Sequence, residues 1–380
     1  MKILAVVLVL IICLPEAGAQ MPTDAVVLED LDRDELTRDL GSEQPEDEKS
    51  ERIWGNNFFA VPIPVSNPTF GTGLAVGAAY FYPQTEAQKA VQPASVTGVA
   101  GFYSNNESMA FGIAHQSYWG GDKWRLGGAA GYIDLKLDLL SPVGGFREAD
   151  IDWFLEGNLF VAKLSRRIRG DWYADLLLRW MDIDQKFSYR LTSDDLELGT
   201  DTQAIGVGVQ IQYDSRDNPF NPYLGGLFRA GATVNEAETG RFTDNYMSYT
   251  AEYRQFHTPR DNLTLGWQLR ACHRSDDVPL WDACVINLRG FNITNYIGRT
   301  TASAQAELRW RLRGRWGLAA FAGAGGYDRS YTRGDKSDLV PSLGIGVRWM
   351  VLESQRINVR VDLAWSDDDN AVYLAVGEAF

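Results

Sequence analysis

The sequence is poor in the residues that most enzymes use for acid–base and metal chemistry. Among its 380 residues are only three histidines, His115, His257 and His273. None of them stands at a recognisable spacing from a nucleophile and an orienting third group, as a hydrolase would require. There is no metal-ligand motif, and no glycine-rich phosphate loop stands out from the other glycines. The sequence therefore predicts a protein that is not an enzyme and that uses no metal and no cofactor.

The sequence also lacks a surplus of positive charge. Its formal net charge is −14 at pH 7, which argues against nucleic acid as a partner. Residues 20–51 hold twelve acidic side chains and three basic ones, so much of the negative charge lies in this short segment. Its many charges and few aromatic residues favour a mostly disordered periplasmic leader. The alternative is a short helix over residues 26–40 that forms when the leader meets a partner.

No apolar run is long enough for a membrane-spanning helix, which needs about 20 residues. The run at 3–14 follows Lys2 and precedes the small residues 17–19, which suit a cleavage site. This order predicts a secretory signal peptide over residues 1–19, and the alternative is a lipoprotein signal that uses Cys13. If the mature chain lies in a membrane, it must cross it with the strands of a closed barrel.

What the sequence has in abundance is alternation of apolar and polar residues from Trp54 onward. In 302–312, Leu308 and Trp310 share an apolar face, while Glu307 lies on the polar face. This period of two predicts strands. We expect sixteen strands, an even number as in bacterial barrels, at 56–64, 70–83, 94–104, 107–118, 123–138, 150–165, 171–186, 199–215, 225–236, 245–257, 261–275, 299–313, 315–328, 339–352, 356–367 and 371–380. The predicted fold is an all-β, 16-stranded antiparallel transmembrane β-barrel of the outer membrane that fills residues 52–380.

The connections between these strands differ in length, which suggests which side each one faces. The tight connections are expected to face the periplasm, and these are 105–106, 167–170, 258–260 and 353–355. The long connections are expected to face outward, and these are 84–93, 139–149, 191–198 and 275–298.

The last strand runs to the carboxy-terminal residue, which is unusual because chain ends normally fray. Its alternation places Leu374, Val376 and Phe380 on one face and Tyr373 and Gly377 on the other. A barrel must pair its last strand with its first, since lipid tolerates no open edge. We therefore interpret Tyr373, Gly377 and Phe380 as the signature of a closing terminal strand.

Two cysteines remain after signal cleavage, Cys272 and Cys284. In an oxidising compartment, two thiols twelve positions apart are most simply a disulfide that closes a loop. The alternative is a metal site, for which only His273 and Asp282 lie near enough in the sequence to add ligands.

Two further segments go beyond a generic barrel. Arg289, Gly290 and Phe291 follow one another in the long connection before the strand at 299–313. The second segment is a turn at 213–226 that contains a series of turn-forming residues, namely Asp214, Arg216, Asp217, Pro219, Pro222 and Gly225. With the terminal strand, these segments resemble the bacterial surface antigen barrel superfamily, which includes BamA- and TamA-like insertases and the two-partner secretion translocators.

The resemblance implies a sixteen-stranded barrel whose sixth outer loop carries the Arg-Gly-Phe motif. Family members place an acidic residue opposite this arginine, which here would be Glu307, and an arginine folded into the lumen needs such a partner. They usually carry a second acid where this sequence has Gly323. The expected substitutes are Asp175, Glu252 or Asp362, and the alternative is that Arg289 is a solvated loop residue.

The family resemblance implies a role in outer-membrane biogenesis or transport, with outer-membrane lipids and protein substrates as partners. The repeat domains that deliver substrates in the family are not expected here. Pro62 and Pro64 lie in the first strand, where proline cannot donate a ladder hydrogen bond, so the seam between first and last strands is expected to open. The alternatives are a small-solute pore, or an anchor whose acidic leader recruits a periplasmic partner.

Overall fold

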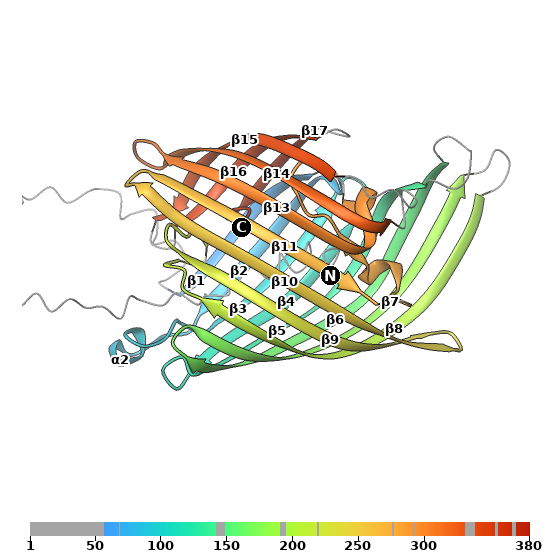
Figure 1. The fold of residues 1–380 in the computed structure, drawn as a ribbon, viewed down its shortest axis with the longest axis horizontal. Helices are drawn as coiled ribbons and strands as arrows, with labels where there is room; N and C mark the ends of the chain where they lie inside the picture. The colour runs from blue at the N-terminus through green and yellow to red at the C-terminus, as the bar shows by residue number, and fades with distance from the viewer. Residues whose placement is uncertain are drawn as a thin grey trace, which may run out of the picture.

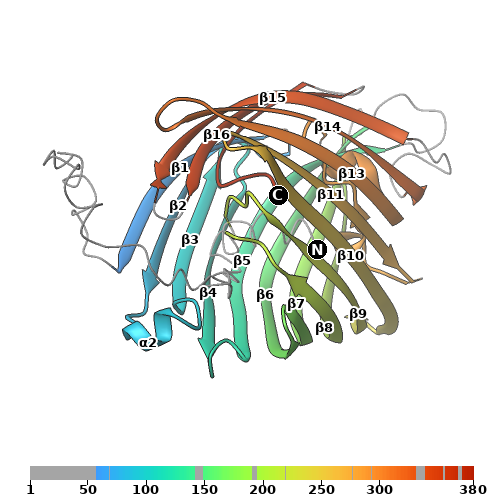
Figure 2. The ribbon, with the colours of Figure 1, turned by 60° about the vertical axis from the view of Figure 1, so that its left-hand side comes forward.

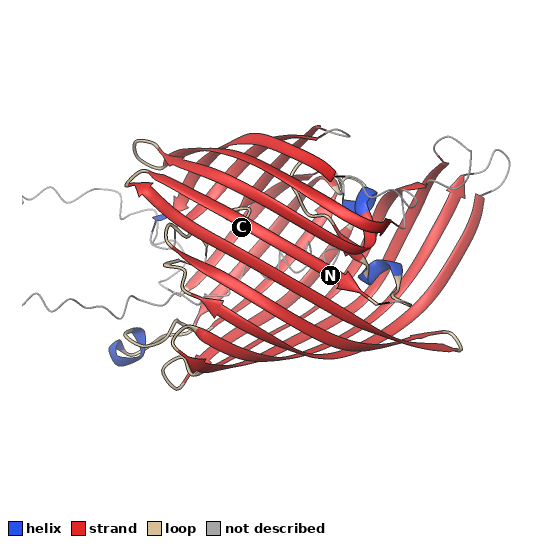
Figure 3. Cartoon of the chain, in the orientation of Figure 1, coloured by secondary structure: helices blue, strands red, loops and turns tan. Residues whose placement is uncertain are grey.

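The computed structural model describes residues 57–67, 69–141, 149–190, 195–218, 220–275, 277–291, 293–330, 339–353, 356–366 and 370–380. The predicted signal peptide, 1–19, and acidic leader, 20–51, lie outside these residues. The described part of the chain is almost entirely strand (Figure 3). No described helix has the length and apolar character that a membrane-spanning helix requires.

Sixteen strands form the wall of the barrel, and their bounds agree with the predicted segments to within a few residues. They are β1 (Phe58–Asn67), β2 (Gly71–Phe81), β3 (Val96–Ser104), β4 (Met109–Trp119), β5 (Trp124–Ser141), β6 (Ala149–Arg169), β7 (Trp172–Arg190), β8 (Asp195–Asp214), β9 (Gly225–Thr239), β10 (Phe242–Arg260), β11 (Leu263–Arg274), β13 (Ile297–Arg311), β14 (Trp316–Ser330), β15 (Leu339–Leu352), β16 (Ile357–Ser366) and β17 (Asn370–Val376).

Each wall strand pairs antiparallel with its neighbours, and β1 pairs with β17 to close the cylinder (Figures 1 and 2). Within the described residues, four short elements lie outside the wall, α2 (Glu86–Lys89), η2 (Leu280–Asp282), β12 (Cys284–Val285) and η3 (Ile293–Tyr296). The structure therefore confirms the predicted all-β, 16-stranded antiparallel transmembrane barrel.

Alternation along the strands sorts the side chains between lipid and lumen. In β13, Leu308 and Trp310 are exposed on the outer face, whereas Gln305, Glu307 and Arg309 are buried inside. Because successive side chains of a strand point to opposite faces, a single strand contributes both to the apolar, lipid-facing surface and to the charged lining of the lumen.

The wall is much taller on one side than on the other. β6 has 21 residues, and β7 and β10 have 19 each, whereas β3 has only 9, so β5–β10 rise above the rest of the barrel at its right-hand end in Figure 1. The inner face of this rise carries Leu137, Trp153 and Ile183, which are buried in one cluster with Trp281. Trp281 belongs to the connection after β11, so the tall side of the wall supports that connection.

Two of the predicted connection sides are wrong. We call the end with the β6–β7 and β10–β11 turns the turn end, and the end with the long 275–296 connection the loop end. Because antiparallel strands alternate in direction, every odd-to-even connection in the first eleven strands lies at the loop end. The tight turn at 105–106 therefore lies at the loop end, and the long 84–93 connection, with α2, lies at the turn end (Figure 1). The length of each connection therefore predicted the wrong side of the barrel for both.

The last strand also ends earlier than predicted. β17 stops at Val376, and Gly377 has φ +85°, which turns the chain out of the wall. Phe380 was predicted to share the lipid face with Leu374, but it is buried and its ring lies 6.1 Å from that of Phe256. The carboxy-terminal tail, residues 377–380, thus turns into the lumen.

Candidate functional site

The candidate site is the connection between β11 and β13, residues 275–296, which we call the lumen loop. Instead of extending away from the barrel, this loop folds back against the inner wall at the loop end, where its short helical turns lie within the barrel outline in Figure 3. The backbone of β12 pairs with β13 through Cys284↔Gly298 and Val285↔Ile297. The loop is therefore held along part of its length as an extra strand.

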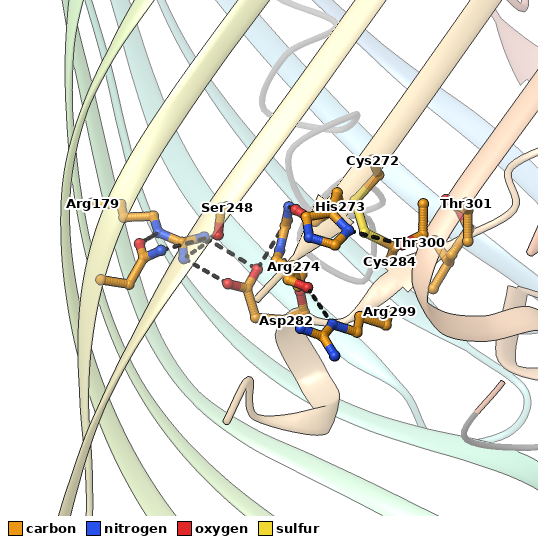
Figure 4. The surroundings of a disulfide bond; sticks show 12 residues. Arg179, Ser248, Cys272, His273, Arg274, Asp282, Cys284, Arg299, Thr300 and Thr301 are labelled. Atoms are coloured by element: carbon orange, nitrogen blue, oxygen red, sulfur yellow. Dashed lines mark hydrogen bonds and ion pairs between the residues drawn. A yellow bond between two sulfur atoms is a disulfide. The ribbon is translucent and has the colours of Figure 1, made fainter. Parts of the chain in front are cut away.

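A disulfide joins Cys272 of β11 to Cys284 of β12, with the two Cα atoms 5.8 Å apart (Figure 4). It closes a covalent loop at the base of the lumen loop. His273 hydrogen-bonds through Nδ1 to Thr300 Oγ1 at 2.8 Å. Among the described residues no group of histidine, cysteine and acidic side chains has the geometry of a metal site.

Asp282, in η2, fastens the first half of the lumen loop to the wall. Its carboxylate accepts hydrogen bonds from Arg179 Nη2 of β7 at 2.5 Å and from Tyr246 Oη of β10 at 2.7 Å. Arg274 of β11 lies 3.5 Å from the same carboxylate, and its Nε donates to the Asp282 carbonyl oxygen at 2.9 Å. Figure 4 shows the carboxylate between the two arginines. All three charged side chains are buried.

The sequence does not reveal this contact, because Arg179 and Asp282 are 103 positions apart. The only available signal was an arginine on the inward face of β7 that had no acid beside it. Burial by itself would raise the pKa of the Asp282 carboxyl, but the guanidinium groups of Arg179 and Arg274 hold that pKa well below its ordinary value.

Changing Asp282 to Asn should destabilise the loop by about 1–3 kcal/mol, because asparagine keeps an oxygen acceptor but leaves two buried arginines without a carboxylate. Since the folded-state pKa of Asp282 is depressed, its contribution is complete above the ordinary carboxyl pKa of about 3.9 and is lost as the pH falls below it. The difference in unfolding temperature between wild type and variant should be constant from pH 8 to 5 and should shrink below pH 4. A difference that instead changes near pH 7 would contradict this assignment.

Arg289 fastens the second half of the lumen loop. Its Nη2 lies 2.5 Å from Glu307 Oε2 of β13, and its Nη1 donates to Asp362 Oδ2 of β16 at 2.8 Å. The guanidinium carbon lies 3.4 Å above the ring centroid of Phe321 on β14. Of the substitutes for the missing second acid, the structure brings Asp362 to Arg289. A planar guanidinium can satisfy both carboxylates and stack on an aromatic ring at once.

Asp175 and Glu252 lie elsewhere. Asp175 accepts a hydrogen bond from Gln210 Nε2 at 2.6 Å. Glu252 is engaged by Arg254 and Arg270, each 2.8 Å away.

Gly290 connects the lumen loop to the last two wall strands. Its N–H donates to Tyr373 Oη of β17, and its carbonyl oxygen accepts from Ser366 Oγ of β16, both at 2.8 Å. Gly290 has φ +102°, and a Cβ there would lie 3.3 Å from the Trp365 backbone. This position therefore needs glycine both for its conformation and for its close approach to β16.

Glycines of β14 give the lumen loop its room. A Cβ at Gly323 would lie 3.2 Å from Leu288 Cδ2, and one at Gly325 would lie 2.6 Å from Ile286 Cγ2. Phe291 of the loop is buried and packs edge-to-face on Tyr296, with ring centroids 5.1 Å apart. The side chain of Leu288 thus lies against the position where family members usually carry the second acid.

Three more arginines surround the two carboxylates that hold Arg289. Arg309 Nε lies 2.7 Å from Glu307, and Arg348 Nη1 lies 2.5 Å from Asp362. Arg360 also pairs with Asp362. The two carboxylates, Arg309 and Arg348 are almost completely buried, and the Arg360 side chain is 13% exposed. Each carboxylate is engaged by several guanidinium groups, as buried charges require.

The carboxy-terminal tail joins the same network. Glu378 lies 2.9 Å from Arg348 and 3.6 Å from Arg309, and it accepts a hydrogen bond from Asn358 at 2.5 Å. The Phe380 carbonyl oxygen accepts from Arg309 Nη2 at 2.7 Å. The end of the chain is thereby bonded to the arginines that also surround Glu307 and Asp362.

The turn at 213–226 lies at the turn end and is held by contacts within it and to other parts of the chain. Asp214 and Arg216 form a buried ion pair at 2.9 Å. Asp217 Oδ1 accepts from two backbone N–H groups across the turn, and its other oxygen lies 2.6 Å from Arg356. Gly225 has φ +87°. Pro222 is buried, and Pro219 lies outside the described residues. These contacts shape the turn, and Asn221 Oδ1 accepts a hydrogen bond at 3.4 Å from Arg309 Nη1, which joins the turn to the arginines around Glu307.

The seam between β1 and β17 is short. β1 pairs with β2 from Phe58↔Tyr80 to Asn67↔Gly71, but within the described residues it pairs with β17 only through Ser66↔Leu374.

The first strand lacks two of its backbone donors at this seam. Phe81 N–H donates to the Asn57 carbonyl oxygen, so the odd positions of β1 bond to β2 and the even positions, including Ser66, present their amides to β17. Pro62 and Pro64 are both at even positions and have no N–H to give.

A sixteen-stranded barrel with an Arg-Gly-Phe loop folded against its inner wall is the architecture that the resemblance to the bacterial surface antigen barrels implies. The match to the Omp85 superfamily domain covers residues 89–380, and the chain belongs to this superfamily. The match confirms the resemblance to the bacterial surface antigen barrels. A search of curated proteins found no match.

Solved structures share the fold. BamA from Haemophilus ducreyi lacking POTRA domains 1–3 has 11% identity and a TM-score of 0.56, and the alignment covers 85% of this chain and 70% of that chain. CdiB from Acinetobacter baumannii has 13% identity, a TM-score of 0.55 and coverage of 85% and 60%. CdiB from Escherichia coli has 13% identity, a TM-score of 0.55 and coverage of 84% and 62%. The chain spans about three fifths of the two CdiB chains.

Proposed function

We propose that this protein acts in the bacterial outer membrane and assembles or transports other proteins through the seam between β1 and β17. The observation that carries the proposal is the seam itself. Two prolines remove donors from the edge of β1 that faces β17, and one residue pair joins the strands among the described residues. A barrel can admit a strand or a lipid with the smallest loss of free energy at an edge that has few backbone hydrogen bonds to break.

The lumen loop favours this route over one along the barrel axis. It occupies the inner wall at the loop end, and Arg179, Glu307 and Asp362 hold it there. Omp85-family barrels are assembly and transport proteins. In this proposal the barrel guides a substrate at its wall, while the lumen loop keeps the axial path closed.

Locking the seam tests the proposal. The pair Ser66→Cys and Leu374→Cys joins the one described pair across it, at a separation that suits a disulfide. The full-length chain in proteoliposomes is given an unfolded outer-membrane barrel protein as the probe, and folding of the probe is followed by its gel mobility. Wild type should accelerate folding, and the oxidised pair should not.

Each single-cysteine variant, oxidised in the same way, controls for the chemistry and should keep full activity. A locked barrel that accelerates folding as well as the controls would contradict the seam as the route. No acceleration by the wild-type chain would contradict the assembly function itself.

A further inference from the structure

The second acid that pairs with Arg289 does not come from the strand on which the family resemblance places it. Gly323 of β14 replaces the usual acid, and Leu288 lies against that position. The carboxylate that pairs with Arg289 instead comes from Asp362 of β16. β16 is the immediate neighbour of β17, so the contact has moved two strands closer to the seam.

We propose that the lumen loop and β17 form one mechanical unit, in which Asp362 and Tyr373 couple the release of Arg289 to the opening of the β1–β17 seam. This inference rests on the proposed function, because it concerns the regulation of the same seam. Tyr373 and Asp362 act as positioning residues for β17.

The first link is the pairing of β16 with β17. Asp362 stands directly opposite Tyr373 in the register of these strands. The carboxylate of Asp362 holds Arg289, while the hydroxyl of Tyr373 accepts the N–H of the next residue, Gly290. One turn of the loop therefore contacts both strands at the same level of the wall.

The second link is the carboxy-terminal tail. Arg348 bonds Asp362 through Nη1 at 2.5 Å and Glu378 through Nε at 2.9 Å. Because Glu378 follows β17 by only two residues, contacts from inside the lumen hold the strand both at Tyr373 and just beyond its last residue. All three of these charged groups are buried, where such pairs are little screened by salt.

The third link is the contrast with the outer edge of the strand. The side of β17 that faces β1 has the single described pair Ser66↔Leu374. The contacts inside the lumen therefore contribute much of the free energy that holds β17 beside β1 in the closed wall. A coupling between two sites is reciprocal, so opening the seam must also weaken the hold on the lumen loop.

The full-length protein carries both Ser66→Cys and Leu374→Cys, and the test measures the rate at which these two cysteines form a disulfide at limiting oxidant. Tyr373→Phe removes one hydroxyl and should slow cross-linking by at most about fivefold, because one net hydrogen bond shifts the equilibrium between the closed and open seam by about that factor. Arg289→Ala should slow cross-linking more than Tyr373→Phe does, because it removes the buried ion pair between Arg289 and Asp362.

Asp282→Asn is the matched control. It releases the first half of the same loop, and the contacts of Asp282 among the described residues are to β7, β10 and β11, whereas Arg289 and Gly290 contact β16 and β17. It should leave the cross-linking rate unchanged. The coupling is contradicted if Tyr373→Phe has no effect, or if Asp282→Asn slows cross-linking as much as Arg289→Ala does.

Reciprocity gives a second readout that does not depend on a loop variant. Locking the seam should slow amide hydrogen exchange at residues 286–291 relative to the single-cysteine controls, and unchanged exchange would overturn the coupling. If the locked barrel keeps its assembly activity while Tyr373→Phe still slows cross-linking, the proposed function fails and the coupling stands.

Discussion

Replacing Arg289 by alanine should destabilise the folded barrel by about 3–5 kcal/mol, because breaking a buried ion pair leaves uncompensated charge behind. Glu307 keeps Arg309, and Asp362 keeps Arg348, so the loss should fall near the lower end of that range. The variant also loses the stacking of the guanidinium on Phe321. The temperature at which the folded gel band converts to the unfolded band measures the effect.

Arg356→Ala is the matched control for this change. Its ion pair with Asp217 has a similar length, with N and O atoms 2.6 Å apart, but both side chains are about one-third exposed. Exposed pairs contribute about 0–1 kcal/mol, so this variant should unfold close to the wild-type temperature. An equal shift in both variants would show that Arg289 is an ordinary surface arginine.

Replacing Asp362 by alanine should have an effect of similar size. The change leaves Arg289, Arg348 and Arg360 with one fewer buried carboxylate among them. The unfolding temperature should fall and the lumen loop should become more accessible to protease. A small change in both would mean that Glu307 alone holds the loop.

The double variant Asp362→Ala, Gly323→Asp asks whether the usual family position can take over. A side chain at residue 323 would lie 2.8 Å from the Ala304 carbonyl oxygen and 3.2 Å from Leu288 at its Cβ alone, and such overpacking costs about 1–3 kcal/mol. The double variant should therefore be less stable than Asp362→Ala. Restored stability would contradict our explanation of why the acid has moved.

Much of the wall could be predicted because alternation is a local signal. The outward Trp310 and inward Glu307 of β13 follow from period two alone. The end of β17 could not be found this way, since alternation continues to Phe380 while the positive φ of Gly377 turns the chain inward. The sides of the 84–93 and 105–106 connections depend on strand parity, which their lengths conceal.

The partner of Arg289 was only partly predictable. Glu307 is the nearest inward acid on the following strand, but Asp175, Glu252 and Asp362 all lie inside the barrel. Which of them a returning loop reaches depends on the curvature of the wall and on packing against Leu288. The contact between Asp282 and Arg179 depends on the same three-dimensional path, and no short-range pattern in the sequence encodes it.

Single-channel conductance of the full-length protein in a planar bilayer tests most directly whether the lumen loop closes the barrel. The account predicts small, irregular currents for the wild-type chain and larger ones for Arg289→Ala, whose loop has lost its contacts with β13 and β16. A large, steady wild-type conductance that Arg289→Ala leaves unchanged would contradict it and would favour a pore for small solutes.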